Sequence, residues 1–176
     1  MSRFRRFERA LGKALAAALL LGPFSTAALA SDDALFQAIE DGRQLAAVAL
    51  VTRGEADVNA RNAQRETPLH RAVEKDMRGL AQALVRAGAS LYARTSNGET
   101  ALHFAALHAD PYFVDLLLAA GADPRARNDD GESVLFWALL SGNTVVAQRL
   151  IEHGADPDAR DLEGNTARQL LERRGK

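Results

Sequence analysis

A period of 33 residues runs through most of this 176-residue chain and constrains its fold more than any other feature. The tetrapeptide Thr67–His70 returns, with substitutions, at Thr100–His103, Ser133–Phe136 and Thr166–Gln169. Two further sets keep the same step, namely a Gly-Ala pair beginning at Gly88, Gly121 and Gly154, and single glycines at Gly98, Gly131 and Gly164. A fixed period of this length predicts supersecondary units that stack on one another, since a single unit cannot bury its own apolar face.

The repeated residues have physical roles in two short helices per unit. Thr67 and its equivalents place a side-chain oxygen where it can cap a helix N-terminus, and Pro68 follows at the first helical position, where a missing N–H costs nothing. Gly88 and its equivalents end the second helix with a left-handed residue. The inner face of each first helix is expected to be made by a leucine and an alanine: Leu69 and Ala72, Leu102 and Ala105, Leu135 and Ala138.

These motifs resemble the ankyrin repeat, whose signature contains T-P-L-H, then A-A, then L-L-x-x-G-A-D. The resemblance covers nearly all of residues 33–174. It implies an all-α solenoid of stacked helix-turn-helix units with β-hairpin finger loops. The expected units are an N-capping repeat at 33–60, full repeats at about 61–93, 94–126 and 127–159, and a C-capping repeat at 160–176, all within one domain at 31–176.

The first finger departs from the pattern. Glu55 is inserted between Gly54 and Ala56, and Arg65 stands where the other units have Gly98, Gly131 and Gly164. A left-handed turn is costlier for a residue with a Cβ atom. We therefore expect the first finger to differ in shape from the others.

Residues 1–30 have the parts of a secretory signal peptide. An arginine-rich start precedes the apolar run Ala14–Leu21, and Ala28-Leu29-Ala30 provides an A-x-A cleavage site. The run is about 8 residues long, against the ~20 needed to span a bilayer, so it does not predict a membrane anchor. Cleavage is expected after Ala30, by the general secretory or the twin-arginine route. The alanine-rich leader is of bacterial type, which places the mature protein in the periplasm, with secretion as the alternative.

Charge and cysteine content exclude several classes of function. Residues 1–30 contain five basic and one acidic side chain, so residues 31–176 hold 17 basic and 22 acidic side chains, a net charge of −5. No basic stripe that could neutralise phosphates is evident, which argues against a nucleic-acid partner. The absence of cysteine excludes disulfides, thiolate metal sites and a lipid-modified cysteine.

No catalytic residue, metal site or cofactor is predicted. The resemblance implies that His70 and His103 bond nearby backbone and brace adjacent loops. His103 and His108 are five residues apart, so they do not share a helix face for a metal. Asn128–Glu132 resembles a calcium loop only faintly and falls in phase at a finger tip, where a solvated turn is the simpler interpretation.

A protein partner is the remaining hypothesis, and three rows of first-helix positions are its candidate surface. The rows are Arg71, Phe104 and Trp137; Glu74, Leu107 and Leu140; and Lys75, His108 and Ser141. Aromatic residues are common in the first row of ankyrin repeats, so core packing equally explains Phe104 and Trp137. Leu107 and Leu140 occupy positions that are usually exposed. Apolar patches of this kind often mark interaction sites.

The finger tips add Tyr92, a plausible aromatic anchor, and the basic residues Arg94 and Arg127. Arg61, Arg94, Arg127 and Arg160 are 33 apart, and a basic residue is ordinary at that ankyrin position. Glu66, Glu99, Glu132 and Asn165 oppose them, so cross-strand pairing is expected to absorb much of the arginine charge.

The sequence thus predicts a monomeric, non-catalytic protein that binds another protein through its fingers and first helices, here the concave face. Two roles stay open, an immunity or inhibitor protein and an accessory factor for an exported enzyme. The alternative is a structural, self-associating protein of the cell envelope.

Overall fold

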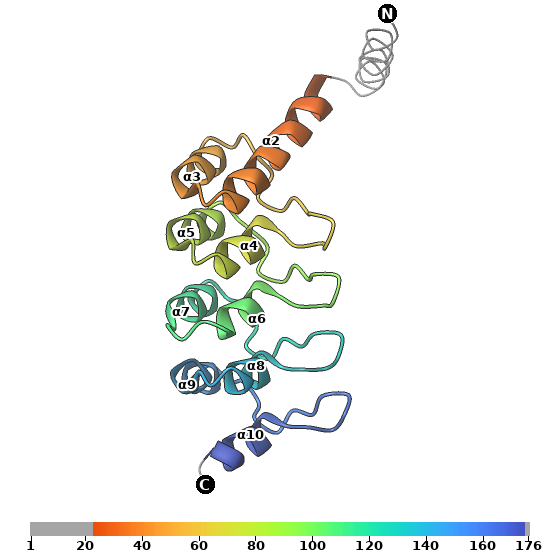
Figure 1. The fold of residues 1–176 in the computed structure, drawn as a ribbon, viewed down its shortest axis with the longest axis vertical. Helices are drawn as coiled ribbons and strands as arrows, with labels where there is room; N and C mark the ends of the chain where they lie inside the picture. Colours follow the sequence, from red (N-terminus) through yellow and green to blue (C-terminus); the bar gives the residue numbers. More distant parts are fainter. Residues whose placement is uncertain (1–22, 175–176) are drawn as a thin grey trace, which may run out of the picture.

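The computed structural model describes residues 23–174, which form nine helices arranged as a one-dimensional stack (Figure 1). The helices are α2 (Pro23–Glu40), α3 (Gln44–Thr52), α4 (Pro68–Glu74), α5 (Arg78–Arg86), α6 (Ala101–Ala106), α7 (Tyr112–Ala119), α8 (Val134–Leu140), α9 (Thr144–Glu152) and α10 (Ala167–Arg174). One column contains α3, α5, α7 and α9, and the other contains α2, α4, α6, α8 and α10, from which the finger loops project (Figure 1). This is the predicted all-helical solenoid.

The helix boundaries follow the capping residues that the sequence predicts. The side chains of Thr67 and Thr100 take part in capping boxes with the histidines three residues later, and Ser133 Oγ accepts the N–H of Phe136 at 3.1 Å. At the other end of each pair, Gly88, Gly121 and Gly154 have φ values of 85°, 99° and 94°. These left-handed glycines let the chain turn out of the second helix into the next finger.

The core is a continuous apolar column between the two rows of helices. Its first-helix members are fully buried or nearly so, and they are Leu69, Ala72, Leu102, Ala105, Leu135 and Ala138. Its second-helix members include Leu84, Leu117 and Leu150. The alanines let the paired helices approach closely, and each leucine layer covers the next, so the stacking of neighbours supplies the core as predicted.

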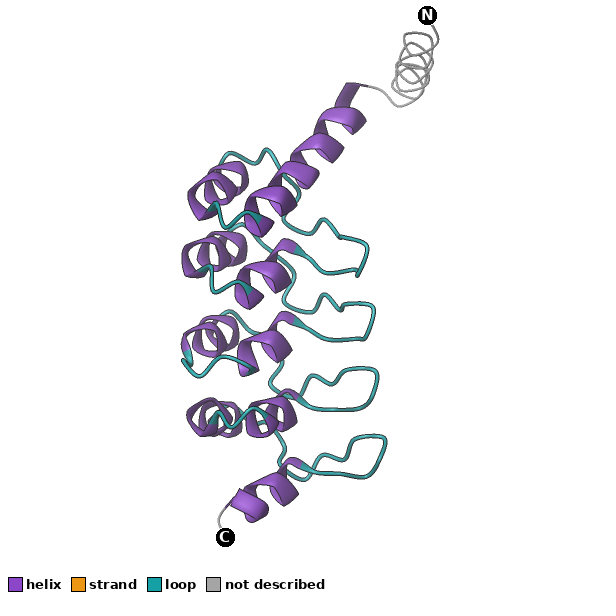
Figure 2. Cartoon of the chain, in the orientation of Figure 1, coloured by secondary structure: helices purple, strands orange, loops and turns teal. Residues whose placement is uncertain are grey.

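The fingers are turns rather than hairpins with strands. No strand is assigned anywhere in residues 23–174 (Figure 2), and pairing is limited to two isolated antiparallel bridges, Arg127 with Ser133 and Arg160 with Thr166. The expected β-hairpins are therefore not confirmed. One backbone hydrogen bond joins each finger tip to the preceding one, from the N–H groups of Ser96, Asp129 and Leu162 to the carbonyls of Gln64, Asn97 and Asp130, at 2.9 to 3.0 Å.

The prediction that the first finger differs in shape is wrong at its turn. Arg65 adopts φ 61°, close to the 79° of Gly98, and its N–H bonds the Asn62 carbonyl at 3.0 Å as the N–H of Gly98 bonds that of Thr95 at 3.1 Å. The rest of the finger imposes the left-handed conformation on Arg65. The loop keeps its shape, and the unfavourable conformation is stored as local backbone strain.

Within residues 23–174, the pair α2 and α3 forms the N-terminal end of the stack. The Asp32 carboxylate accepts the backbone N–H of Asp57 at 2.7 Å, which ties α2 to the first finger. The expected cleavage point after Ala30 lies within α2, while residues 1–22 of the expected signal peptide lie outside the described residues. None of the helices within 23–174 combines the length and the apolar character needed to cross a bilayer.

Candidate functional site

Two leucines of the predicted surface are exposed at equivalent positions of adjacent units. Leu107 follows α6 directly and is 49% exposed, and Leu140 ends α8 and is 60% exposed. Both lie 33 residues apart on the first-helix column, where the fingers also originate. Their exposure contrasts with the complete burial of Leu139, the neighbour of Leu140. Core packing therefore does not explain why leucine occupies these two positions.

Phe104 and Trp137 are half-buried, and their rings pack against the apolar core beside that pair. The rings of Phe104 and His70 pack edge-on with their centroids 5.7 Å apart. The rings of Trp137 and His103 pack in the same way, with their centroids 5.4 Å apart. Trp137 Nε1–H also donates to the Glu132 carboxylate at 2.7 Å. These contacts hold both aromatic side chains in one orientation. The accessible part of each ring is therefore rigid.

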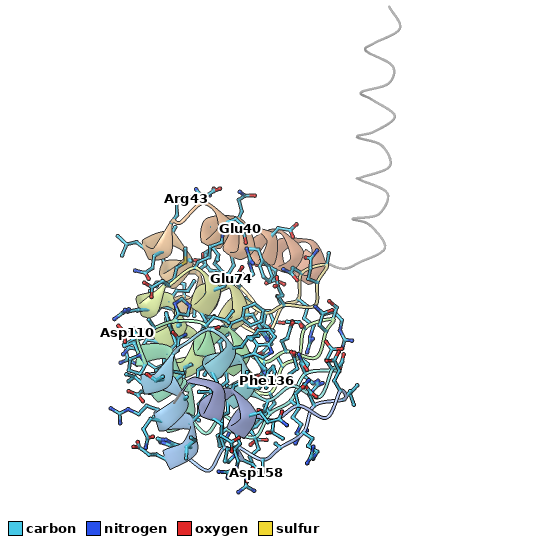
Figure 3. All side chains as sticks on the ribbon, turned by 60° about the horizontal axis from the view of Figure 1, so that its bottom comes forward. Glu40, Arg43, Glu74, Asp110, Phe136 and Asp158 are labelled. Carbon is cyan, nitrogen blue, oxygen red and sulfur yellow. The ribbon has the colours of Figure 1, made fainter. Side chains whose placement is uncertain are left out.

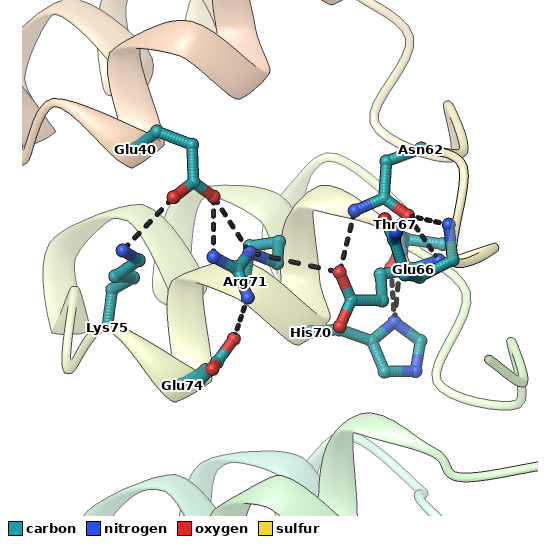
Figure 4. Close-up of polar contacts among 9 residues, drawn as sticks. Glu40, Asn62, Glu66, Thr67, His70, Arg71, Glu74 and Lys75 are labelled. Atoms are coloured by element: carbon teal, nitrogen blue, oxygen red, sulfur yellow. Dashed lines mark hydrogen bonds and ion pairs between the residues drawn. The ribbon is translucent and has the colours of Figure 1, made fainter. Parts of the chain in front are cut away.

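The same row begins with charge in the first full repeat. Arg71 donates to Glu40 at 2.6 and 2.9 Å and also pairs with Glu74, while Lys75 reaches Glu40 at 3.1 Å (Figure 4). Hydrogen bonds from Arg71 and then from Lys75 hold the pKa of Glu40 below its ordinary value. In the row of Arg71, Phe104 and Trp137, the first member thus belongs to an ion-pair network beside α2. The other two members are aromatic.

His70 and His103 are structural, as the resemblance implies. Nδ1 of each accepts the backbone N–H of the threonine three residues earlier at 3.1 Å, and His70 Nε2–H donates to the Glu99 carbonyl of the next finger at 3.3 Å. Burial lowers the pKa of His70, and it lowers the pKa of His103 to about 4. Both rings are therefore neutral at pH 7. His70 links its repeat to the next finger, whereas Nε2 of His103 has no hydrogen-bond partner within the described residues.

His108 and Tyr92 also contact neighbouring units. His108 Nε2–H donates to the Val73 carbonyl at 2.8 Å, so this side chain links α6 to the preceding repeat as well as lying in the candidate row. Tyr92 is 65% exposed, and its hydroxyl donates to the Gly121 carbonyl at 2.9 Å. That bond holds the ring in one position while leaving most of its surface open to a partner.

The finger arginines form a ladder along the stack, and the expected cross-strand pairing with glutamates is wrong. Arg61, Arg94 and Arg127 each donate to the backbone carbonyl of the arginine 33 residues later, at 2.9 Å for the first and 2.8 Å for the second. The opposing acidic residues bond within their own fingers instead, Glu66 with Asn62, Glu99 with Thr95 and Glu132 with Asn128. Arg94 also pairs with Asp129 at 2.7 Å.

Two residues to which the sequence pattern gave no binding role, Phe136 and Leu162, line a cavity of about 560 Å³. The cavity is also lined by Leu140, Asp130, Glu132, Asp161, Glu163 and Asn165. Phe136, labelled in Figure 3, occupies the position of His70 and His103 in its own repeat. Leu162 is 78% exposed at the tip of the last finger. The break in the histidine register and a leucine at a finger tip are signals that the sequence did contain.

Within residues 23–174, no group of three or more His, Asp or Glu side chains is arranged to hold a metal ion. Asn128, at the start of the loop compared with a calcium site, is buried, and its side-chain oxygen accepts the N–H groups of Asp130 and Glu132 at 3.1 and 2.9 Å. That oxygen shapes the turn.

A family profile described as ankyrin repeats, in three copies, matches residues 35–128 and 77–161. The chain therefore belongs to the ankyrin-repeat family, whose members are general protein–protein interaction modules of typically non-catalytic character. No curated protein matches the chain.

Proposed function

We propose that this protein binds a partner protein in the periplasm through the face formed by its first helices and fingers. The observation that carries the proposal is the exposed pair Leu107 and Leu140, set beside the half-buried rings of Phe104 and Trp137. An apolar patch on rigid elements is a suitable centre for an interface, because little side-chain order is lost on binding. The further contact residues that we assign to the face are Tyr92, Arg94, Arg127 and His108.

Two roles fit this binding activity, and both are proposals. The protein acts either as an immunity or inhibitor protein that covers the active surface of a toxin or enzyme, or as an accessory factor for an exported enzyme. The function of the captured partner, and the effect of the complex on its activity, separates the two. Inhibition of the partner favours the first role, and protection or loading favours the second.

The experiment is affinity capture from periplasmic extract with the tagged full chain and two variants. Leu107→Glu/Leu140→Glu places charge in the patch, and the matched control Val145→Glu places charge on α9 of the other column, where Val145 is 56% exposed. The wild type and the control should retain one specific partner, and the double variant should lose it with unchanged helical spectrum and melting temperature. Loss of the partner with both variants would show that the binding face is misplaced.

Self-association is the competing outcome. A second cavity of about 400 Å³ at the N-terminal end of the stack is lined by alanines of α2 and α3 together with Arg43 and Arg53. Leu45 on α3 is 86% exposed. Sedimentation of the purified protein at increasing concentration distinguishes the two functions. A mass that stays at one chain supports the binding module, and growing assemblies sensitive to Leu45→Glu support a structural protein.

A further inference from the structure

The cavity between α8 and the last finger, which we call the terminal groove, combines an apolar floor with an acidic rim. Phe136 and Leu140 come from α8, and Leu162 comes from the tip of the last finger. The rim is formed by four carboxylates, those of Asp130, Glu132, Asp161 and Glu163. A volume of about 560 Å³ falls in the range of roughly 300 to 1,000 Å³ that is usual for sites that bind ligands.

At the junction with the last finger, phenylalanine stands where the two preceding repeats have His70 and His103. At the first junction His70 Nε2–H reaches the Glu99 carbonyl of the next finger, and phenylalanine at position 136 has no such donor. The last finger keeps the backbone and arginine hydrogen bonds that also join the other fingers. Leu162 N–H bonds the Asp130 carbonyl at 3.0 Å, and Arg127 donates to the Arg160 carbonyl. The last finger is therefore fixed to the preceding one, and the half-buried ring of Phe136 lines the groove beside it.

The rim retains its negative charge. Across residues 23–174 no ion pair joins any of these four carboxylates to a cation, although twelve ion pairs are formed elsewhere. Burial opposes ionisation of Asp161, but hydrogen bonds from Asn165, Glu163 and Gly164 hold its pKa below the ordinary value. The nearby arginines donate to backbone carbonyls, Arg127 to Gly131 and Arg160 to Gly164.

Charge complementarity identifies the occupant. We infer that the terminal groove binds a segment of the partner protein that presents a lysine or arginine side chain next to an aliphatic or aromatic one. The cation meets the rim of Asp130 and Glu163 while the apolar side chain covers Leu140 and Leu162. Within residues 23–174 no three of the rim carboxylates form a group that could hold a metal ion. The inference rests on the proposed function, since it names the chemistry of the partner at one end of the binding face.

The test is selection of random peptides displayed on phage against the immobilised full chain, followed by affinity measurement with the enriched peptides. The groove variant Asp130→Asn/Glu163→Gln keeps side-chain shape and removes two charges. The matched control Asp115→Asn/Glu152→Gln removes two charges from the second-helix column, where both carboxylates lie by Arg149. Leu162→Ser and Leu45→Ser form the corresponding apolar pair, since both leucines are exposed.

The expected result is enrichment of peptides with Lys or Arg beside an apolar residue. Their affinity should fall about tenfold in the groove variant, as for two partly screened ion pairs, and should fall with Leu162→Ser but stay within twofold in both controls. Enriched peptides without a basic residue, or peptides sensitive to Leu107→Glu and indifferent to the groove variant, would overturn the inference and leave the proposed function standing. No enrichment on any form of the protein would overturn both.

Discussion

Burial of a neutral histidine makes the stability of this protein depend on pH. His103 is fully buried, its Nδ1 accepts the N–H of Thr100, and its ring lies edge-on against Trp137. Its Nε2 makes no hydrogen bond of good geometry within the described residues, and the nearby Glu132 carbonyl only partly offsets the effect of burial on its pKa. Protonating this ring in the folded state is therefore costly.

The magnitude follows from the difference in pKa between the folded and unfolded states. The pKa of His103 falls from 6.5 to about 4 on folding, and each pKa unit corresponds to about 1.4 kcal/mol. The unfolded chain binds the proton first as the pH falls, so the stability is lost between pH 6.5 and pH 4. The full loss is about 3 kcal/mol, of which about 2 kcal/mol falls between pH 7 and pH 4.5.

The assay is urea unfolding at pH 7 and pH 4.5, followed by the helical circular-dichroism signal, for the wild type and His103→Gln. Glutamine already stands at the equivalent position of the last repeat, where Gln169 accepts the N–H of Thr166 at 3.1 Å. It therefore preserves the cap and does not titrate. Acidic residues contribute equally to both proteins, so the difference between them isolates His103.

The wild type should lose about 2 kcal/mol more than His103→Gln on going from pH 7 to pH 4.5. Equal losses in the two proteins would mean that the folded and unfolded states protonate His103 alike, so that burial does not lower its pKa. His70, whose pKa burial also lowers, should behave in the same direction in a parallel His70→Gln series.

Three other predictions concern single positions. Leu135→Ala should lower the free energy of unfolding by about 2–5 kcal/mol, because it opens a cavity at a fully buried site. Urea unfolding measures this loss, and a loss below about 1 kcal/mol would place Leu135 outside the core. Arg65→Gly should raise that free energy by about 0.5–1 kcal/mol by relieving the left-handed conformation at φ 61°, and a decrease would show that the conformation carries no strain. The exported protein should begin at Ser31 by N-terminal sequencing; a chain that still begins at Met1 would contradict the predicted cleavage.

The helices could be predicted from the sequence because their signals are local. Thr67 and Gly88 cap the ends of one helix pair through bonds to residues three to five positions away, and the same residues return every 33 positions. The leucine and alanine layers follow from that period. The conformation of Arg65 could not be predicted, because the turn is imposed by its neighbours against the preference of the residue itself.

The terminal groove and the arginine ladder could not be predicted because they depend on how neighbouring units are placed. Phe136 and Leu162 are 26 positions apart and meet only across the junction between two repeats. The regular spacing of Arg61, Arg94 and Arg127 was visible, yet whether a guanidinium meets a glutamate or the next finger's carbonyl is decided by the offset between fingers. Leu107 and Leu140 were predictable as exposed because the repeat fixes which helix face is covered.

Site-specific photo-crosslinking shows whether a partner protein covers the first-helix and finger face. A benzophenone amino acid replaces Leu107, Leu140 or, as the control on the opposite column, Val145 in the protein expressed in its own host. All three side chains are exposed to a similar degree, so the crosslinker is equally accessible at each position. One discrete adduct is expected at positions 107 and 140, and none at 145. The same adduct at 145, with none at 107 or 140, would mean that the partner binds the second-helix column.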